Sequence, residues 1–230
     1  MKLVVCNQKA YLESNEVNRF IEGIKDYNLT NIIICPSIIY IDRFKTLNIP
    51  LGSQLVSIHN NGSYTGEITA KQLKNIEVTY AIVGHSEHKD TKENIIKRIN
   101  LLTLEDIIPI LCIGETLEDK NNNLSKEVIY KKITEILDEI KEIKDLIIAY
   151  EPIYSIGTNI VPANEEIIEV VTYIKDIINK RYNKKVKVLY GGSVNRESIN
   201  NLNKIEILDG YLVGKASTNY LELKEIIKKA

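Results

Sequence analysis

The stretch LIIAYEPIYSIGT, residues 146–158, carries more structural information than any other part of the chain. Its apolar beginning, residues 146–149, has the length and composition of a buried strand. Glu151 follows at the C-terminal end of that strand, directly before Pro152, and a loop with one glycine leads to a helix that opens near Asn164. A carboxylate on a rigid strand end beside a loop is how a barrel enzyme presents a base to a small substrate.

The same pattern, an apolar run followed by polar residues, recurs along the whole chain. The predicted strands are residues 3–6, 32–35, 55–58, 80–83, 108–113, 146–149, 186–189 and 210–213. They are apolar without alternation, which is typical of parallel strands covered by helices on one side and packed against a barrel interior on the other.

Stretches with apolar residues at helical spacing separate these strands. They are residues 14–27, 93–102, 124–143, 165–182 and 221–228. Ser14 and Asn164 are the expected N-caps of two of them, and Asn195 is expected to open a shorter helix. Eight strands alternating with about eight helices predict an α/β fold, a closed (β/α)8 TIM barrel in which residues 1–230 form a single domain.

The composition of the 230 residues excludes several classes of function. The 30 basic and 31 acidic side chains give a formal net charge of -1, and the chain has two Phe and no Trp. This balance argues against a dedicated binder of nucleic acid or of a membrane surface. The N-terminal apolar run is too short for the core of a signal peptide, and no run reaches the length of a membrane span. We therefore expect a cytoplasmic enzyme with no nucleic-acid or membrane partner.

The three cysteines, Cys6, Cys35 and Cys112, all lie at ends of predicted strands. Their number is odd and no two of them form a Cys-x-x-Cys pair, so we expect buried apolar thiols in a reducing compartment. His85 and His88 lack the helical spacing of metal ligands and a third partner, so we expect no metal site.

Polar side chains gather where the predicted strands end, and in a barrel these ends form the active site. Isomerising an α-hydroxy carbonyl needs one base that moves a proton between adjacent carbons, and donors that hold the enediolate oxygens. Glu151 is the candidate base, and His85, Lys9 and Asn7 are the candidate donors. A phosphate on the substrate would need backbone N–H groups, which glycine-rich turns expose.

Six of these segments resemble triosephosphate isomerases in their order and spacing. They are NQK at 7–9, GHSE at 84–87, CIGE at 112–115, AYEPIYSIGT at 149–158, YGGSV at 190–194 and DGYLVG at 209–214. The resemblance extends from about residue 2 to about residue 227. It implies interconversion of dihydroxyacetone phosphate and D-glyceraldehyde 3-phosphate in glycolysis and gluconeogenesis, with neither cofactor nor metal.

The resemblance also implies a role for each matching residue near the reacting carbons. Glu151 would shuttle the proton between C1 and C2, and His85 would polarise the carbonyl as a neutral electrophile. Ser86 and Glu87 would begin a short helix whose dipole keeps the imidazole uncharged, as it does in this family. Lys9 would offset the negative charge of the substrate, with Glu87 holding the lysine, and Asn7 matches the family's asparagine beside it.

At the phosphate end, the resemblance implies binding by backbone N–H groups. These map to Gly157, Ser193, Gly214 and Lys215, the residue after Gly214. A lid would run from residue 152 to about residue 162, and its closure would exclude water and prevent loss of phosphate by elimination. Tyr190 and Ser193 would hold the closed lid. Cys112 and Glu115 would be supports, with the acid bonding the open lid through Tyr154.

The chain departs from the family pattern at a few positions. They are Gln8 for an aromatic residue, His88 and Lys89 for two arginines, Tyr154 for tryptophan, Asn159 for glycine, Pro162 at the trailing hinge, and Lys215 for glycine. We expect Gln8 to face a subunit contact and Pro162 to stiffen the lid.

Thr65 lies in a loop that reaches into the neighbouring subunit in this family, although here the loop is a few residues short. A homodimer is the expected assembly, and a tetramer is the alternative. Two other functions stay open at this point: another phosphate-binding barrel enzyme, such as a different sugar-phosphate isomerase, and a non-catalytic binding or scaffold protein on the same fold.

Overall fold

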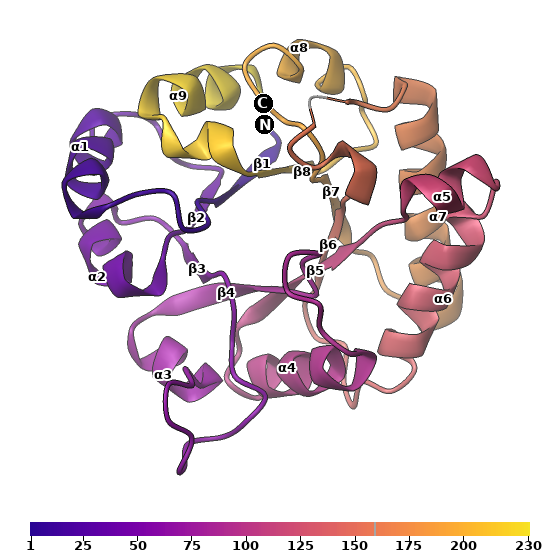
Figure 1. Cartoon of the computed structure of the whole chain (residues 1–230), viewed down its shortest axis with the longest axis horizontal. Coiled ribbons are helices and arrows are strands. Elements are labelled where there is room, and N and C mark those ends of the chain that lie inside the picture. The colour runs from indigo at the N-terminus through magenta and orange to yellow at the C-terminus, as the bar shows by residue number, and fades with distance from the viewer. Residues whose placement is uncertain (159) are drawn as a thin grey trace.

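Eight parallel strands close into a barrel in the computed structural model, which describes residues 1–158 and 160–230 (Figure 1). The strands are β1 (Leu3–Asn7), β2 (Ile32–Cys35), β3 (Leu51–Ser53), β4 (Val78–Val83), β5 (Ile108–Ile113), β6 (Ile147–Tyr150), β7 (Lys187–Tyr190) and β8 (Gly210–Val213). Each strand pairs with its neighbours in chain order, and β1 pairs with β8 to complete the ring. The predicted (β/α)8 barrel is confirmed.

Helices form a ring around the barrel (Figure 1). They are α1 (Ser14–Ile24), α2 (Ile41–Phe44), α3 (Ala70–Asn75), α4 (Lys92–Leu104), α5 (Leu117–Asn121), α6 (Ser125–Leu137), α7 (Asn164–Tyr182), α8 (Ile199–Leu202) and α9 (Tyr220–Lys229). Short 3-10 helices lie at Ile38–Tyr40, Lys45–Leu47, Ile153–Ser155 and Lys215–Thr218. In the described part of the chain, none of the helices combines the length and the apolar character that a membrane crossing requires.

Strand alternation divides the buried side chains into two cores. On β5, Ile110 and Cys112 belong to the cluster inside the barrel, whereas Leu111 and Ile113 belong to the cluster between the barrel and the helices. Successive side chains of a strand point to opposite faces, so a continuous apolar run serves both cores. This explains why the strands read as apolar without alternation.

The third strand was predicted wrongly at residues 55–58. The structure places β3 at Leu51–Ser53, and Leu55 lies outside the sheet with 37% of its surface exposed. The strand contains Gly52 because a Cβ atom there would collide with the Cys35 sulfur inside the barrel. A three-residue strand with glycine at its centre contains no apolar run, so the prediction chose the more apolar residues 55–58 that follow it.

The helices expected near Ser14 and Asn164 begin at those residues, but Ser14 and Asn164 are not the N-caps, and the helix expected to open at Asn195 begins at Ile199. The N-caps of α1 and α7 are Glu13 and Ala163, whose backbone N–H groups donate to Glu16 Oε2 at 2.9 Å and Glu166 Oε2 at 3.1 Å. An acid in the first turn thus satisfies the cap N–H and favours the helix dipole.

Asn195 instead closes a turn ahead of α8. Its Oδ1 accepts the N–H groups of Glu197 and Ser198, both at 2.9 Å.

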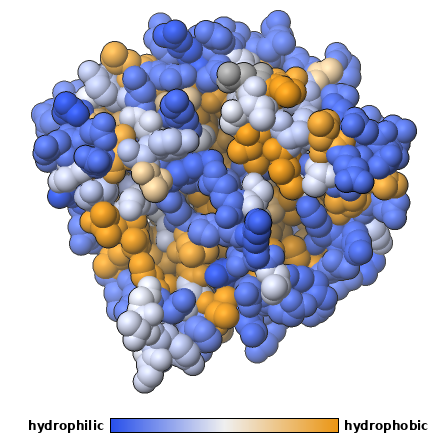
Figure 2. Space-filling view, in the orientation of Figure 1, coloured by the Kyte–Doolittle hydropathy of each residue, from blue (hydrophilic) through white to orange (hydrophobic). Residues whose placement is uncertain are grey.

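The barrel face that carries the loop after β6 is hollowed at its centre. Figure 2 shows this face with hydrophilic side chains around the periphery and apolar side chains in patches nearer the middle. The carboxyl ends of the strands open here, so this is the face on which a barrel builds its site.

Candidate active site

The candidate catalytic residues converge on one cleft of about 470 Å3 at this face. Asn7 is the last residue of β1, His85 lies two residues beyond β4, and Glu151 directly follows β6. The cleft is lined by Asn7, Lys9, His85, Glu151, Gly157, Ser193, Gly214 and Lys215, among others. Residues far apart in the sequence meet here because parallel strands present their carboxyl ends at one rim.

The Glu151 carboxylate lies beside the His85 imidazole in the lining of the cleft. The distance between Glu151 Oε1 and His85 Nε2 is 3.6 Å, and the two residues are 4% and 5% exposed. Burial raises the pKa of Glu151 to about 7, against the opposing effects of a Cys112 hydrogen bond and the Lys9 charge. A carboxylate with a pKa near neutrality is well matched to accept and return a proton.

His85 is neutral, but the predicted short helix at Ser86 and Glu87 is wrong. These residues form a turn, closed by the His88 N–H donating to the His85 carbonyl at 2.8 Å. Burial and the nearby Lys9 charge lower the pKa of His85 to about 4. The Glu87 N–H donates to Nδ1 at 3.2 Å, so the ring proton is on Nε2, facing Glu151.

Lys9 is held in the cleft by an ion pair and a strained backbone. Its Nζ lies 2.6 Å from Glu87 Oε1. Burial raises the pKa of Glu87, but the ion pair with Lys9 outweighs this effect and the pKa is lowered overall. Lys9 has a φ of +48°, and its N–H donates to Asn7 Oδ1 at 3.3 Å. A non-glycine residue at positive φ is costly, and such strain is found where a side chain must be aimed.

The loop after β6 is bonded to the YGGSV turn through three hydroxyl groups. Ser193 Oγ donates to the Ser155 carbonyl at 2.6 Å. The hydroxyl of the fully buried Ser155 donates to the Ile160 carbonyl at 2.7 Å and lies 2.9 Å from the Tyr190 hydroxyl, which therefore donates to it. Gly157, with a φ of +69°, lines the cleft. The expectation for Asn159 falls outside the described residues.

Sequence reasoning missed two contacts of this site, made by Ser155 and by Cys112. Cys112 lowers the pKa of the Glu151 carboxyl, against the effect of burial, in addition to packing inside the barrel. The position of Cys112 on the strand next to β6 was a usable signal, since neighbouring strand ends meet. The serine in the loop carried no signal of its own, because its partner Ile160 contributes only a backbone carbonyl.

Two expectations about supporting residues were wrong. Gln8 does not face a subunit contact: it is 2% exposed and its Nε2 donates to the Ser217 carbonyl at 3.3 Å within the chain. Glu115 accepts a hydrogen bond from the Tyr150 hydroxyl at 3.0 Å rather than from Tyr154. The buried Gln8 amide takes a backbone carbonyl as its partner, as buried polar groups normally do.

The Tyr154 ring lies instead beside Lys120, whose Nζ is 5.0 Å from the ring centroid.

Thr65 lies apart from the cleft, on an exposed loop. In the described residues, no group of three or more His, Cys, Asp and Glu side chains is arranged to hold a metal ion.

Comparison with known proteins agrees with this geometry. Residues 2–230 match the family model described as triosephosphate isomerase. A triosephosphate isomerase of Dictyoglomus thermophilum is 35% identical, over 99% of this chain and 98% of that protein. A triosephosphate isomerase of Francisella tularensis subsp. mediasiatica is 31% identical, over 100% of this chain and 97% of that protein. Since the match covers nearly the whole of both chains, the chain belongs to the triosephosphate isomerase family.

Proposed function

We propose that this chain interconverts dihydroxyacetone phosphate and D-glyceraldehyde 3-phosphate by moving one proton between C1 and C2 through an enediolate. The observation that carries the proposal is the Glu151–His85 pair. A carboxylate with a pKa of about 7 lies 3.6 Å from a neutral imidazole, and both are buried in the wall of an open cleft. One group accepts a proton while the other donates to oxygen, as the reaction requires.

Glu151 takes the proton from the carbon next to the carbonyl, and the electron pair of the broken C–H bond moves onto the carbonyl oxygen. The Nε2–H of His85 donates to that oxygen as negative charge develops there. Its low pKa makes the imidazole a neutral donor, closer in acidity to an enediol than an imidazolium is. The hydroxyl proton of the other enediolate oxygen moves to this oxygen. Glu151 then returns its proton to the neighbouring carbon as the other oxygen becomes the new carbonyl.

Lys9 and Asn7 lie on the β1 side of the same cleft. The Lys9 ammonium offsets the negative charge of the phosphorylated enediolate, and Glu87 keeps the ammonium in place. The Asn7 side chain fixes the turn that aims Lys9, and its amide N–H groups are donors for a substrate oxygen.

The substrate phosphate binds where the loops after β6, β7 and β8 line the cleft. Its ligands are the backbone N–H groups of Gly157, Ser193, Gly214 and Lys215. Closure of residues 152–162 excludes water, so that the enediolate is protonated before it loses phosphate. The hydroxyl groups of Tyr190 and Ser193 support the closed loop through Ser155.

The expected assembly is a homodimer, with a tetramer as the alternative. The exposed loop around Thr65 supports it, because this loop projects from the barrel and its tyrosine, Tyr64, is 47% exposed. The cytoplasm is the expected compartment, since Cys6, Cys35 and Cys112 are all free and buried.

Two rival functions are separated by a substrate panel. The purified protein is incubated with D-glyceraldehyde 3-phosphate, dihydroxyacetone phosphate and ribose 5-phosphate, and product formation is followed by NMR. We expect turnover of the two trioses alone. Turnover of the pentose phosphate alone would favour another sugar-phosphate isomerase. Binding of the trioses with no turnover would indicate a non-catalytic protein.

A further inference from the structure

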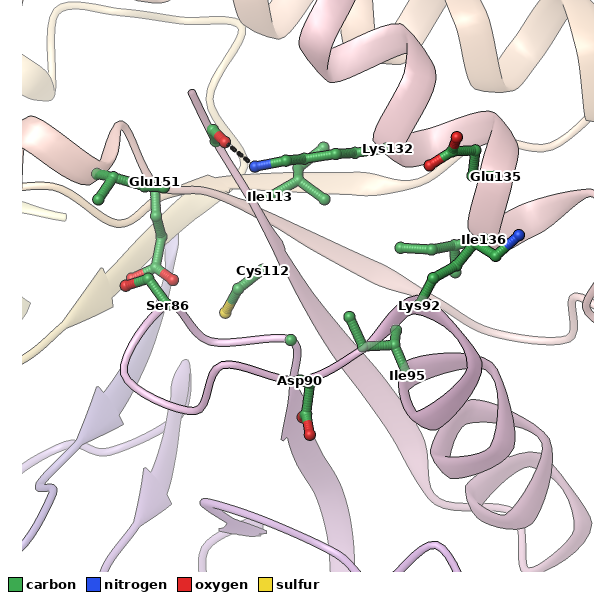
Figure 3. A pocket seen from close by; sticks show the side chains of 13 residues that line it. Ser86, Asp90, Lys92, Ile95, Cys112, Ile113, Lys132, Glu135, Ile136 and Glu151 are labelled. Carbon is green, nitrogen blue, oxygen red and sulfur yellow. Dashed lines mark hydrogen bonds between the residues drawn. The ribbon is translucent and has the colours of Figure 1, made fainter. Parts of the chain in front are cut away.

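A second cavity, of about 240 Å3, has the Glu151 side chain in its lining (Figure 3). It is lined by the loop after β4, by the end of β5 and by helices α4 and α6, and Figure 3 shows Ser86 and Cys112 beside Glu151. Among the described residues, Glu151 alone lines both this cavity and the cleft. The carboxylate therefore forms part of the wall between two solvent-sized spaces.

The cavity contains polar groups that need hydrogen-bond partners. Glu151 Oε2 and Asp90 Oδ2 are buried, and neither has a hydrogen-bond partner among the described residues. Lys132 Nζ donates to the Gly114 carbonyl at 2.6 Å, which uses one of its three N–H groups. Buried acceptors of this kind are normally satisfied by ordered water, and a cavity of this size has room for several molecules at about 30 Å3 each.

We propose that this cavity holds the water that exchanges the proton of Glu151 with solvent during turnover. The inference deepens the proposed function and rests on it. After proton abstraction Glu151 is a carboxylic acid. Its O–H bond breaks as the proton passes to a cavity water, and a proton from the same water chain forms a new O–H bond. Nothing is oxidised or reduced, and the proton delivered to the next carbon then comes from solvent.

The cavity is better suited to this exchange than the cleft. Substrate fills the cleft during turnover, and lid closure removes water from it. Of the lid residues that the structure describes, only Ile153 lines the cavity. Most of the other lining residues belong to the loop after β4, to β5, to α4 and to α6, so the water in this cavity stays in place when the lid moves.

The test measures how the proton is partitioned. D-Glyceraldehyde 3-phosphate is converted in D2O, and NMR gives the ratio of dihydroxyacetone phosphate carrying deuterium at C1 to product carrying the transferred hydrogen. Ile136 lines the cavity from α6 and is 5% exposed. Ile136→Phe fills the space and is expected to lower the ratio about twofold or more, while Ile136→Ala enlarges it and raises the ratio.

Ile133→Phe is the matched control. Ile133 is fully buried on the same helix but does not line the cavity, so its substitution overpacks the core without displacing cavity water. Its ratio is expected to equal that of the parent. Normal turnover with the same ratio in the parent and both Ile136 variants overturns the inference and leaves the proposed function intact. Absence of turnover in the parent refutes the proposed function itself.

Discussion

The placement of Glu151 depends on a glycine that faces it. A Cβ atom at Gly191 would lie 2.5 Å from Glu151 Cγ and 3.0 Å from its Oε1, whereas ordinary contacts begin at 3.4 Å. Gly191→Ala therefore forces the stem of the base to retreat by about 0.9 Å. A displacement of about 1 Å at a reacting group lowers the rate by about 100-fold, so we expect kcat to fall by about that factor with KM changed far less.

The assay is steady-state isomerisation of D-glyceraldehyde 3-phosphate, coupled to NADH oxidation. Gly62→Ala is the control, since its nearest neighbour is the flexible ring of the exposed Tyr64 at 3.1 Å and it lies outside the cleft. Thermal unfolding shows whether both variants fold. A Gly191→Ala enzyme with the parental kcat would mean that the carboxylate is not held where the structure places it, or that it is not the base.

The remaining predictions concern pH, the lid and the phosphate end. The pKa of Glu151 is raised to about 7, so kcat/KM is expected to fall below about pH 7 as the base is protonated; His85, with a pKa of about 4, adds no inflection above pH 5. A limb centred near pH 4.5 would contradict this environment for the base. Because the pKa of Glu151 is raised in the folded state, its contribution to stability is present below about pH 4.5 and is lost as pH rises through about 7. In urea unfolding at pH 8, Glu151→Gln is therefore expected to have a free energy of unfolding about 3 kcal/mol above that of the parent. Near pH 4 the two free energies are expected to be equal. Ser155→Ala leaves the buried Tyr190 hydroxyl without its acceptor, which is expected to lower the free energy of unfolding by about 1–3 kcal/mol. It is also expected to raise the amount of inorganic phosphate released per turnover. If neither quantity changes, Ser155 has no part in holding the lid. Lys215→Gly removes an exposed cation near the phosphate ligands and is expected to raise KM up to about fivefold with kcat unchanged. Salt at about 0.5 M is expected to abolish this difference in KM, because it screens the charge. A change in KM that does not depend on salt would mean that residue 215 acts through its backbone conformation.

The barrel was predictable because most of its strands are continuous apolar runs in the sequence. Seven of the strands lie within one or two residues of the predicted ranges. The exception is the strand Leu51–Ser53, in which Gly52 leaves room for the Cys35 sulfur of the neighbouring strand. The hydrophobic pattern of a segment indicates whether its own residues are buried, but it does not indicate how much space a side chain of the neighbouring strand requires.

The candidate site was predictable where side chains follow strand ends. Asn7, Lys9, His85 and Glu151 line one cleft, as their positions at or just beyond the carboxyl ends of β1, β4 and β6 require. Their catalytic roles stay predictions. The turn after His85 was not foreseeable, because a dipole-bearing helix and a turn share the same short polar sequence.

The hydroxyl network at Ser155 and the inward fold of Gln8 also escaped prediction. Ser155 bonds Ile160 and Gln8 bonds Ser217, and in both cases the partner is a backbone carbonyl, which every residue has. No pattern of side-chain types can identify such a partner before the chain is folded.

The most direct test of the central claim compares Glu151→Gln with the parent enzyme. Glutamine keeps nearly the same volume but cannot accept the substrate proton, so only the chemistry changes. We expect kcat to fall by about a thousandfold or more while a nonreactive triose phosphate analogue still binds the folded variant. A Glu151→Gln enzyme that retains the parental kcat would show that proton transfer does not depend on this carboxylate.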